Sequence, residues 1–185
     1  TRRGAAVDLR SPKRGVNREL MEIAQANAKA TLITKGRVGG EEAKAQLAHA
    51  AEVLGLTSLP LYVEAVDLSH LHGEEAVGAV VVFREGVPSN REHRRYLIRT
   101  AKGGDDFAGM REVVRRRLAR LSGEGAKLPD LLLLDGGPGQ LQAGLAACAD
   151  AKVSLPVIAL AKREELVFRP GVPEPLRLPA VVLGP

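Results

Sequence analysis

The stretch LPDLLLLDGGPGQLQAG, at residues 128–144, limits most strongly what this chain can fold into. Its four consecutive leucines, Leu131 to Leu134, predict a strand that is buried on both faces, and the residues after the glycine pair have a helical pattern. The strand ends on Asp135, although a carboxylate is rarely buried without a partner. We therefore expect a strand, a turn and a helix, with a charged group at the carboxyl end of the strand.

Further strands are expected on both sides of this unit. PVIAL follows the helix and completes a strand–helix–strand unit with parallel strands. Upstream, three segments are rich in Val, Ile and Tyr and are separated by turn residues: LYVEAVDL, AVGAVVVF and HRRYLIRT. They predict three sequential antiparallel strands arranged as a meander.

An amphipathic helix is expected between the meander and the leucine-rich strand. Asp105 and Asp106 offer an N-cap at its start. Its apolar stripe consists of Phe107, Met110, Val114, Leu118 and Leu121. The order of elements therefore predicts an α/β fold with a mixed sheet flanked by helices, which is the outline of a ribonuclease-H-like fold.

The 185 residues divide into three parts: a basic leader or linker at 1–16, an extension of two helices at 17–59, and the ribonuclease-H-like domain at 60–185. With 45% hydrophobic and 26% charged residues, the composition is typical of a globular domain. No apolar run approaches the ~20 residues of a membrane span, so we expect a soluble cytoplasmic protein. The single cysteine, Cys148, is interpreted as a small buried side chain.

Basic charge is concentrated in one part of the sequence. Residues 84–120 contain eleven Lys and Arg against five Asp and Glu, whereas the net charge of the whole chain is +5. Such a patch favours a polyphosphate partner. Because only 3% of the residues are aromatic, contact with a duplex backbone is favoured over stacking on splayed bases. An Arg-rich solvated surface is the alternative.

Two carboxylates occupy equivalent places. Asp67 ends the first expected strand, as Asp135 ends the fourth. If these strands are neighbours, the two acids lie side by side and repel each other, which a divalent cation such as Mg²⁺ or Mn²⁺ would relieve. Paired carboxylates with such metals can activate water for phosphodiester cleavage. For either acid alone, a turn residue or a helix cap is the more common role, and only the pair together with the basic patch favours catalysis.

The glycine pair after Asp135 needs an explanation of its own. DGGPGQL resembles a phosphate-binding turn, but it lacks the spacing of the known nucleotide motifs. We expect Gly136 and Gly137 to provide backbone freedom beside a metal site, where a Cβ atom would crowd the turn.

Taken together, VEAVDLSHLHG, DDFAGMREVVRRRLARL, LPDLLLLDGGPGQLQAG and LPVIALAKREE resemble the C-terminal half of the UvrC family, the incision proteins of the bacterial ABC excinuclease, over about residues 14–179. The resemblance implies a ribonuclease-H-like endonuclease that makes the incision 5′ of a lesion in double-stranded DNA during bacterial nucleotide-excision repair. It also implies a partner, the excinuclease B subunit, whose contact we expect outside this chain.

The resemblance also assigns residues. Asp67 and Asp135 match the metal-binding catalytic acids of the family, and Asp106 matches a further acid needed for incision, with N-capping as its alternative role. Four basic residues match candidate contacts to backbone phosphates: Arg94, Arg95, Lys162 and Arg163. For each of these four, a plain surface charge is the alternative.

Some elements of the family pattern differ. Its catalytic histidine lies in a helical DEAHRF element that does not occur in these residues, and none of His49, His70, His72 and His93 takes its place. Pro138 stands where the family usually has lysine. We therefore expect the C-terminal part of the domain to be incomplete, and the chain to fold and bind DNA weakly but to cut it poorly.

Two other functions remain open. The chain could be a catalytically silent ribonuclease-H-like module that binds DNA or acts as a scaffold, or an α/β protein that binds a phosphate ligand at the glycine turn. Metal-dependent nicking of damaged duplex separates the nuclease from the silent module. Saturable nucleotide binding without affinity for DNA would favour the third function.

Overall fold

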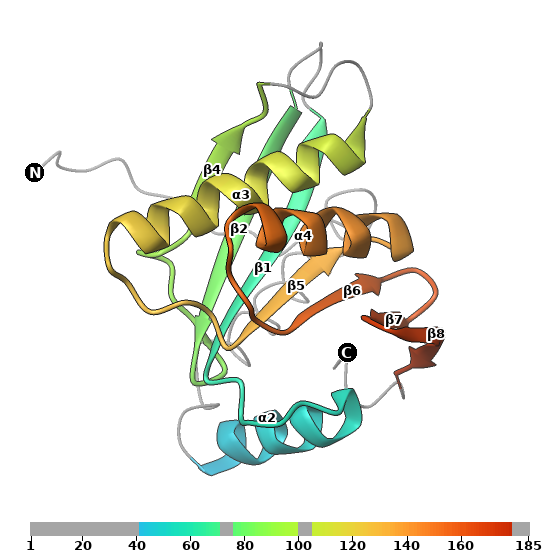
Figure 1. Cartoon of the computed structure of the whole chain (residues 1–185). Helices are drawn as coiled ribbons and strands as arrows, with labels where there is room; N and C mark the ends of the chain where they lie inside the picture. Colours follow the sequence, from blue (N-terminus) through green and yellow to red (C-terminus); the bar gives the residue numbers. More distant parts are fainter. Residues whose placement is uncertain (1–40, 71–75, 100–104, 179–185) are drawn as a thin grey trace, which may run out of the picture. The chain divides into compact units, whose positions relative to one another are not determined.

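The computed structural model describes residues 41–70, 76–99 and 105–178 (Figure 1). The elements in chain order are α2 (Glu41–Leu54), β1 (Tyr62–His70), β2 (Ala76–Arg84), β3 (Val87–Pro88), β4 (Arg94–Leu97), α3 (Asp106–Gly123), β5 (Leu131–Asp135), α4 (Pro138–Asp150), β6 (Val157–Ala161), β7 (Leu166–Arg169) and β8 (Val172–Arg177). The expected leader and the first expected helix lie outside these residues. The second expected helix is α2.

The described strands form one eight-stranded mixed sheet in the order β3-β2-β1-β5-β6-β7-β8, with β4 also pairing with β2. The antiparallel meander is confirmed, because β1 pairs with β2 and β2 pairs with β4 in antiparallel register. The strand–helix–strand unit is confirmed as well, because β5 and β6 are parallel. Most importantly for the site, β1 and β5 are parallel neighbours.

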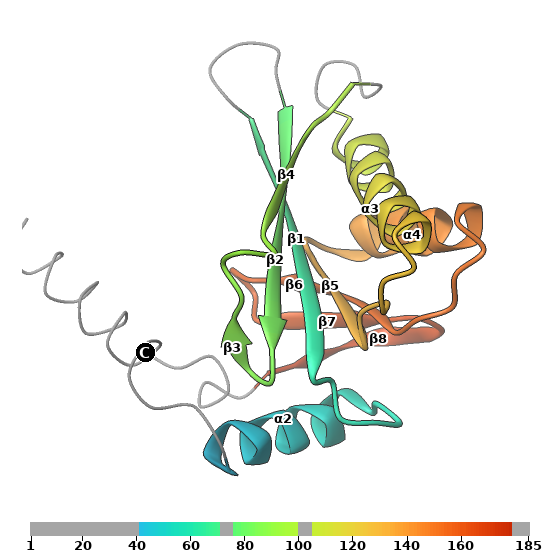
Figure 2. The ribbon, with the colours of Figure 1, turned by 90° about the vertical axis from the view of Figure 1, so that its left-hand side faces the viewer.

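One face of the sheet is covered by α3 and α4 (Figure 2). Their apolar residues form the main core with alternate residues of the strands, including Val66, Leu132 and Leu134. Cys148 is buried there as a free thiol, as expected. The opposite face carries a second cluster around Leu131 and Ile158, to which α2 contributes.

Two contacts hold α3 and α4 together. The ring of Phe107, in the first turn of α3, lies so close to Gly139 in the first turn of α4 that a Cβ atom there would collide with it. One turn further along α3, Arg111 donates two hydrogen bonds of 2.8 Å to Asp150, the last residue of α4. Phe107 nevertheless remains 53% exposed.

A buried ion pair joins α3 to β1. Glu64 is fully buried and accepts a hydrogen bond from the hydroxyl of Tyr62. It also accepts one from Arg117, whose Nε lies 2.9 Å from Glu64 Oε2. Burial and the neighbouring carboxylate raise the pKa of Tyr62 to about 12. Burial would lower the pKa of Arg117, but the hydrogen bonds and charge of Glu64 raise it above its ordinary value. Both charged groups are therefore satisfied inside the core.

The hairpin formed by β7 and β8 was not expected from the sequence. Its turn contains Pro170 and Gly171, and Gly171 has a φ of +72° that favours glycine. The two strands are short, and β8 contains Pro173 and Pro175, which weaken a strand pattern. No helix in the described ranges is both long and apolar enough to cross a membrane.

Candidate active site

Asp67 and Asp135 lie at the same level of neighbouring strands. Asp135 ends β5 as expected, but the expectation that Asp67 ends its strand is wrong, because β1 continues to His70 in antiparallel pairing with β2. Val66 of β1 pairs with Leu134 of β5, and each is followed by one of the acids, Asp67 and Asp135. Since Val66 and Leu134 point into the core beneath α3 and α4, alternation directs the two acids to the opposite face of the sheet. The juxtaposition expected from the sequence is present.

The electrostatics of the pair are those of two acids in competition. The pKa of Asp67 is raised from 3.8 by partial burial, by a hydrogen bond with Asp135 and by repulsion from that carboxylate, while Lys162 opposes the rise. Neighbouring carboxylates repel each other and favour a state with less negative charge. The site therefore disfavours two negative charges unless a cation is close.

Lys162 supplies one such cation. Its Nζ lies 2.7 Å from Oδ2 of Asp135, and this pair raises the pKa of Lys162. Lys162 directly follows Ala161, the last residue of β6, which is the parallel neighbour of β5. A contact to phosphate was expected of this lysine, but in this structure its ammonium is paired with the acid.

Arg95 lies on the other side of the acids. Asp67 pairs with Ala79 of β2, and Ala79 pairs with Arg95 of β4, so the three residues share one face of the sheet. Arg95 is exposed, whereas Arg94 donates hydrogen bonds to the backbone oxygens of Arg91 and His93. The acid pair is thus flanked by Lys162 and Arg95.

The third expected acid, Asp106, lies at the start of α3 and not on a strand of the sheet. The N-cap of α3 is Asp105, whose Oδ1 accepts a hydrogen bond of 3.0 Å from the Ala108 amide, so capping is not the role of Asp106. Asp106 is the first residue of α3. Within residues 41–70, 76–99 and 105–178, no group of three His, Cys, Asp or Glu side chains could hold a metal ion. Among the described residues, Asp67 and Asp135 therefore have no third His, Cys, Asp or Glu beside them that would complete a metal site.

The histidines give no further ligand in the described residues. His49 is exposed on α2, and His93 is half-buried before β4 with its Nε2 unpaired among those residues. His70 ends β1, but its side chain, like all of His72, lies outside the described part of the chain. The expectation that none of these histidines replaces the catalytic one of the family therefore remains a prediction.

The turn after Asp135 requires glycine at one of its two positions. Gly136 has a φ of +140°, and a Cβ atom there would lie 2.5 Å from the side-chain Cδ of Gln140. Gly137 has no neighbour within 4 Å of such an atom, and its amide donates a hydrogen bond of 2.9 Å to Gln140 Oε1. The expected need for backbone freedom is correct at Gly136, but the crowding group is Gln140.

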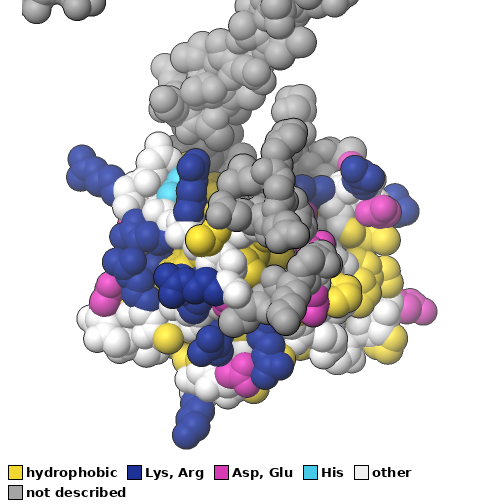
Figure 3. All heavy atoms as spheres, turned by 90° about the horizontal axis from the view of Figure 1, so that it is seen from above, with side chains coloured by type: hydrophobic (Ala, Val, Ile, Leu, Met, Phe, Trp, Pro, Cys, Tyr) yellow, Lys and Arg dark blue, Asp and Glu magenta, His cyan; other side chains and the backbone are white. Residues whose placement is uncertain are grey.

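Much of the basic charge in residues 84–120 is neutralised. Five of its arginines form ion pairs, and three of their partners lie outside that range: Arg84 with Glu92, Arg111 with Asp150, Arg116 with Glu112, Arg117 with Glu64, and Arg120 with Glu124. Lys and Arg side chains nevertheless cover more of the described part of the face in Figure 3 than Asp and Glu side chains do. The count from the sequence thus overstates the free charge.

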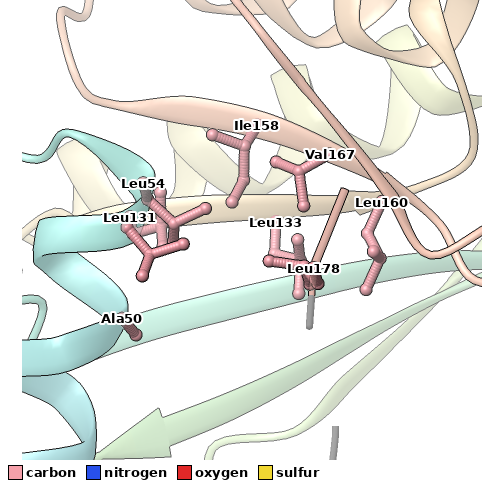
Figure 4. A pocket seen from close by; sticks show the side chains of 9 residues that line it. Ala50, Leu54, Leu131, Leu133, Ile158, Leu160, Val167 and Leu178 are labelled. Carbon is pink, nitrogen blue, oxygen red and sulfur yellow. The ribbon is translucent and has the colours of Figure 1, made fainter. Parts of the chain in front are cut away.

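A pocket elsewhere on the sheet is apolar. It has a volume of about 130 Å³ and lies between α2 and β5–β7 (Figure 4), lined by Ala50, Val53, Leu54, Leu131, Leu133, Ile158, Leu160, Val167 and Leu178. With no polar side chain in its lining, it offers nothing to bind a metal ion or a phosphate. The acid pair is therefore the candidate active site.

Residues 51–181 match the family described as the UvrC RNAse H endonuclease domain. The chain belongs to this family. The expected ribonuclease-H-like fold class and the resemblance to the UvrC family are thereby confirmed.

Relatives of this UvrC-type domain are much longer proteins. UvrABC system protein C of Synechococcus sp. (strain JA-3-3Ab) is 46% identical over 96% of this chain and 29% of its own length. The protein of the same name from Methanococcoides burtonii is 40% identical over 94% of this chain and 30% of its own length. The chain thus spans less than a third of these relatives.

Among solved structures, the likeness is partial. Endonuclease V of Ciona intestinalis, in complex with a 23mer DNA containing an inosine followed by a ribo-adenosine, is 17% identical, with a TM-score of 0.43 over 76% of this chain and 58% of that one. Thermus thermophilus RuvC is 20% identical, with a TM-score of 0.29 over 53% and 60%. The family assignment does not depend on either structure.

Proposed function

We propose that this domain is a divalent-metal-dependent endonuclease that cuts the DNA backbone 5′ of a lesion in nucleotide-excision repair. The observation that carries the proposal is the pair formed by Asp67 and Asp135, which follow the paired residues Val66 and Leu134 on neighbouring parallel strands and repel each other. Family membership and relatives named UvrABC system protein C support the role in repair.

The donor set suits a hard divalent cation. Carboxylate oxygens are the preferred ligands of Mg²⁺ and Mn²⁺, and the raised pKa of Asp67 indicates that the pair lacks positive charge. Asp67 and Asp135 would hold the ion. When bound, such an ion supplies positive charge to the reacting phosphate and activates water.

The other residues act on the substrate. Arg95 and Arg163 are exposed, and we propose that they bind backbone phosphates, together with Arg94 and Lys162 once these are released from their present partners. Asp106 is proposed as a further acid required for incision. A metal ion held by Asp67 and Asp135 alone would be loosely positioned, so we expect cleavage with these two ligands to be slow.

Calorimetry with Mn²⁺ and nicking of a lesion-bearing duplex test the proposal. Wild-type protein should bind Mn²⁺ and nick the duplex slowly, and both should be lost in Asp67→Asn and in Asp135→Asn. DNA binding should persist in both variants. Undiminished Mn²⁺ binding in both variants would refute the metal site, and DNA binding without any nicking would favour the catalytically silent module.

The salt dependence of DNA binding tests the phosphate contacts. If ~4 to 6 phosphates are contacted, the log–log slope on duplex DNA should be roughly −4 to −5. Reversal of Arg94 and Arg95 to glutamate should weaken binding at every salt concentration. A slope near zero would exclude an electrostatic interface.

A further inference from the structure

We propose that Lys162 is a tethered counter-ion that occupies the place of the metal and is released to a DNA phosphate when the metal binds. The inference rests on the proposed function, because it assigns a second state to the same acid pair. It differs from a plain phosphate contact, since the availability of Lys162 depends on whether the acids hold a metal.

The geometry places the ammonium group of Lys162 beside Asp135 but leaves the lysine side chain able to move away. Asp135 pairs with Leu160 across β5 and β6, and Lys162, two residues further along, faces the same side of the sheet. Its Nζ is 2.7 Å from Asp135 Oδ2. The Lys162 side chain is 60% exposed and that of Asp135 is 28% exposed, so the flexible lysine stem can turn into solvent.

Exchange of the lysine for a metal ion follows from the charges. Two carboxylates and one ammonium leave a site that is short of positive charge, whereas a divalent ion can neutralise both acids. An exposed ammonium–carboxylate pair contributes little to an equilibrium, typically no more than a ~5-fold factor. The metal can therefore displace Lys162 from Asp135 at a small cost.

The released lysine then couples the metal to DNA. Without metal, Asp135 neutralises Lys162, so this ammonium makes no contact with a phosphate. With metal, Lys162 is free beside the acids and adds one positive charge to the surface that includes Arg95. Metal binding should thus strengthen DNA binding, and by reciprocity DNA should strengthen metal binding by the same factor.

Calorimetry with Mn²⁺ on the full chain tests the competition. Lys162→Met keeps the length of the stem and removes the charge, so we expect ~3- to 5-fold tighter Mn²⁺ binding. Lys162→Arg keeps the charge and should bind Mn²⁺ like wild type. The matched control is Lys127→Met, because Lys127 forms a similar exposed pair with Asp130 at the other end of β5. Unchanged or weaker Mn²⁺ binding in Lys162→Met would overturn the proposal.

The release of the lysine is tested by the salt dependence of binding to a non-cleavable phosphorothioate duplex, with and without Mn²⁺. Mn²⁺ should steepen the log–log slope of wild type by about 0.9 relative to Lys162→Met at the same Mn²⁺ concentration. Lys127→Met should behave like wild type. Equal responses to Mn²⁺ in wild type and Lys162→Met would overturn the release.

The two proposals fail in different ways. If only the counter-ion proposal fails, Mn²⁺ binding will be lost in Asp67→Asn but will be unchanged in Lys162→Met. Failure of the metal site would appear as Mn²⁺ binding that Asp67→Asn leaves intact, or as no binding at all, and would remove both proposals. Thermal unfolding of each variant shows whether it is folded under the conditions of the assay.

Discussion

Strand β1 carries two carboxylates three residues apart, on opposite faces of the sheet, with opposite surroundings. Glu64 is fully buried and is held by Arg117 and Tyr62. Asp67 is only partly buried and faces a second acid, Asp135, with one exposed lysine to balance both. One strand thus contains a satisfied charge and an unsatisfied one.

The difference separates a charge that stabilises the fold from charges for which we propose a function. A buried acid with a complete set of partners fixes how α3 lies on the sheet, and its removal is felt in stability. Two acids held together with too little positive charge reduce stability, so their presence points to a role in binding or chemistry. The comparison predicts that substitutions at the two places affect different measurements.

The largest effect is expected from Arg117→Met. This variant leaves Glu64 charged and unpaired in the core, which should lower the free energy of unfolding by ~3 to 5 kcal/mol, as measured by urea denaturation. Mn²⁺ affinity should not change. Arg120→Met is the matched control, because its pair with Glu124 is exposed and should be worth no more than ~1 kcal/mol.

A double variant sharpens this prediction. Combining Arg117→Met with Glu64→Met removes the unpaired charge as well, so at least ~1 kcal/mol of the loss should be recovered. If the double variant is as unstable as Arg117→Met alone, packing of the arginine rather than its charge carries the effect.

A smaller loss is expected at the turn that follows Asp135. Gly136→Ala introduces a side chain at positive φ and against Gln140, which should cost ~1 to 3 kcal/mol of unfolding free energy. Gly137→Ala meets no neighbour and should cost less than ~1 kcal/mol, through its position as N-cap. Equal losses would show that the turn does not distinguish the two glycines.

Asp67→Asn should stabilise the protein slightly at neutral pH. Because the pKa of Asp67 is raised in the folded state, its contribution is fully present below about pH 3.8 and is lost as the pH rises through the folded-state value. The asparagine in Asp67→Asn cannot ionise, so the stability of this variant is not lowered in this way as the pH rises. Its Tm in EDTA should exceed that of wild type by a few degrees at most at pH 7, and the difference should vanish near pH 3.5. A lower Tm at pH 7 would contradict the sign.

The smallest effect on stability is expected from Lys162→Met. Its ion pair is exposed, so the free energy of unfolding in EDTA should change by less than ~1 kcal/mol. Urea denaturation of Lys162→Met and Arg117→Met under the same conditions measures the difference between their free energies of unfolding. A loss as large as that of Arg117→Met would mean that Lys162 is a structural partner of the acids.

The acid pair could be predicted from the sequence because the apolar run before each acid is visible in it, although β1 extends past Asp67 to His70. Four leucines before Asp135 and a Val-rich strand before Asp67 are enough to place both acids, once the two strands are taken as neighbours. The partners of the charges could not be predicted in this way. Lys162 is 27 residues from Asp135, and Arg117 is 53 residues from Glu64, so only the folded sheet brings them together.

The two contacts between α3 and α4 have a consequence for motion. Phe107 packs against the first turn of α4, and Arg111 is bonded to its last residue, so α4 is held by α3 at both ends. An opening that exposes the backbone of one helix must also break contacts of the other. Amide protons of the two helices should therefore exchange with solvent as one cooperative unit. Asp135 ends the strand that leads into α4, so the acid is anchored to a part of the molecule that should open as a whole.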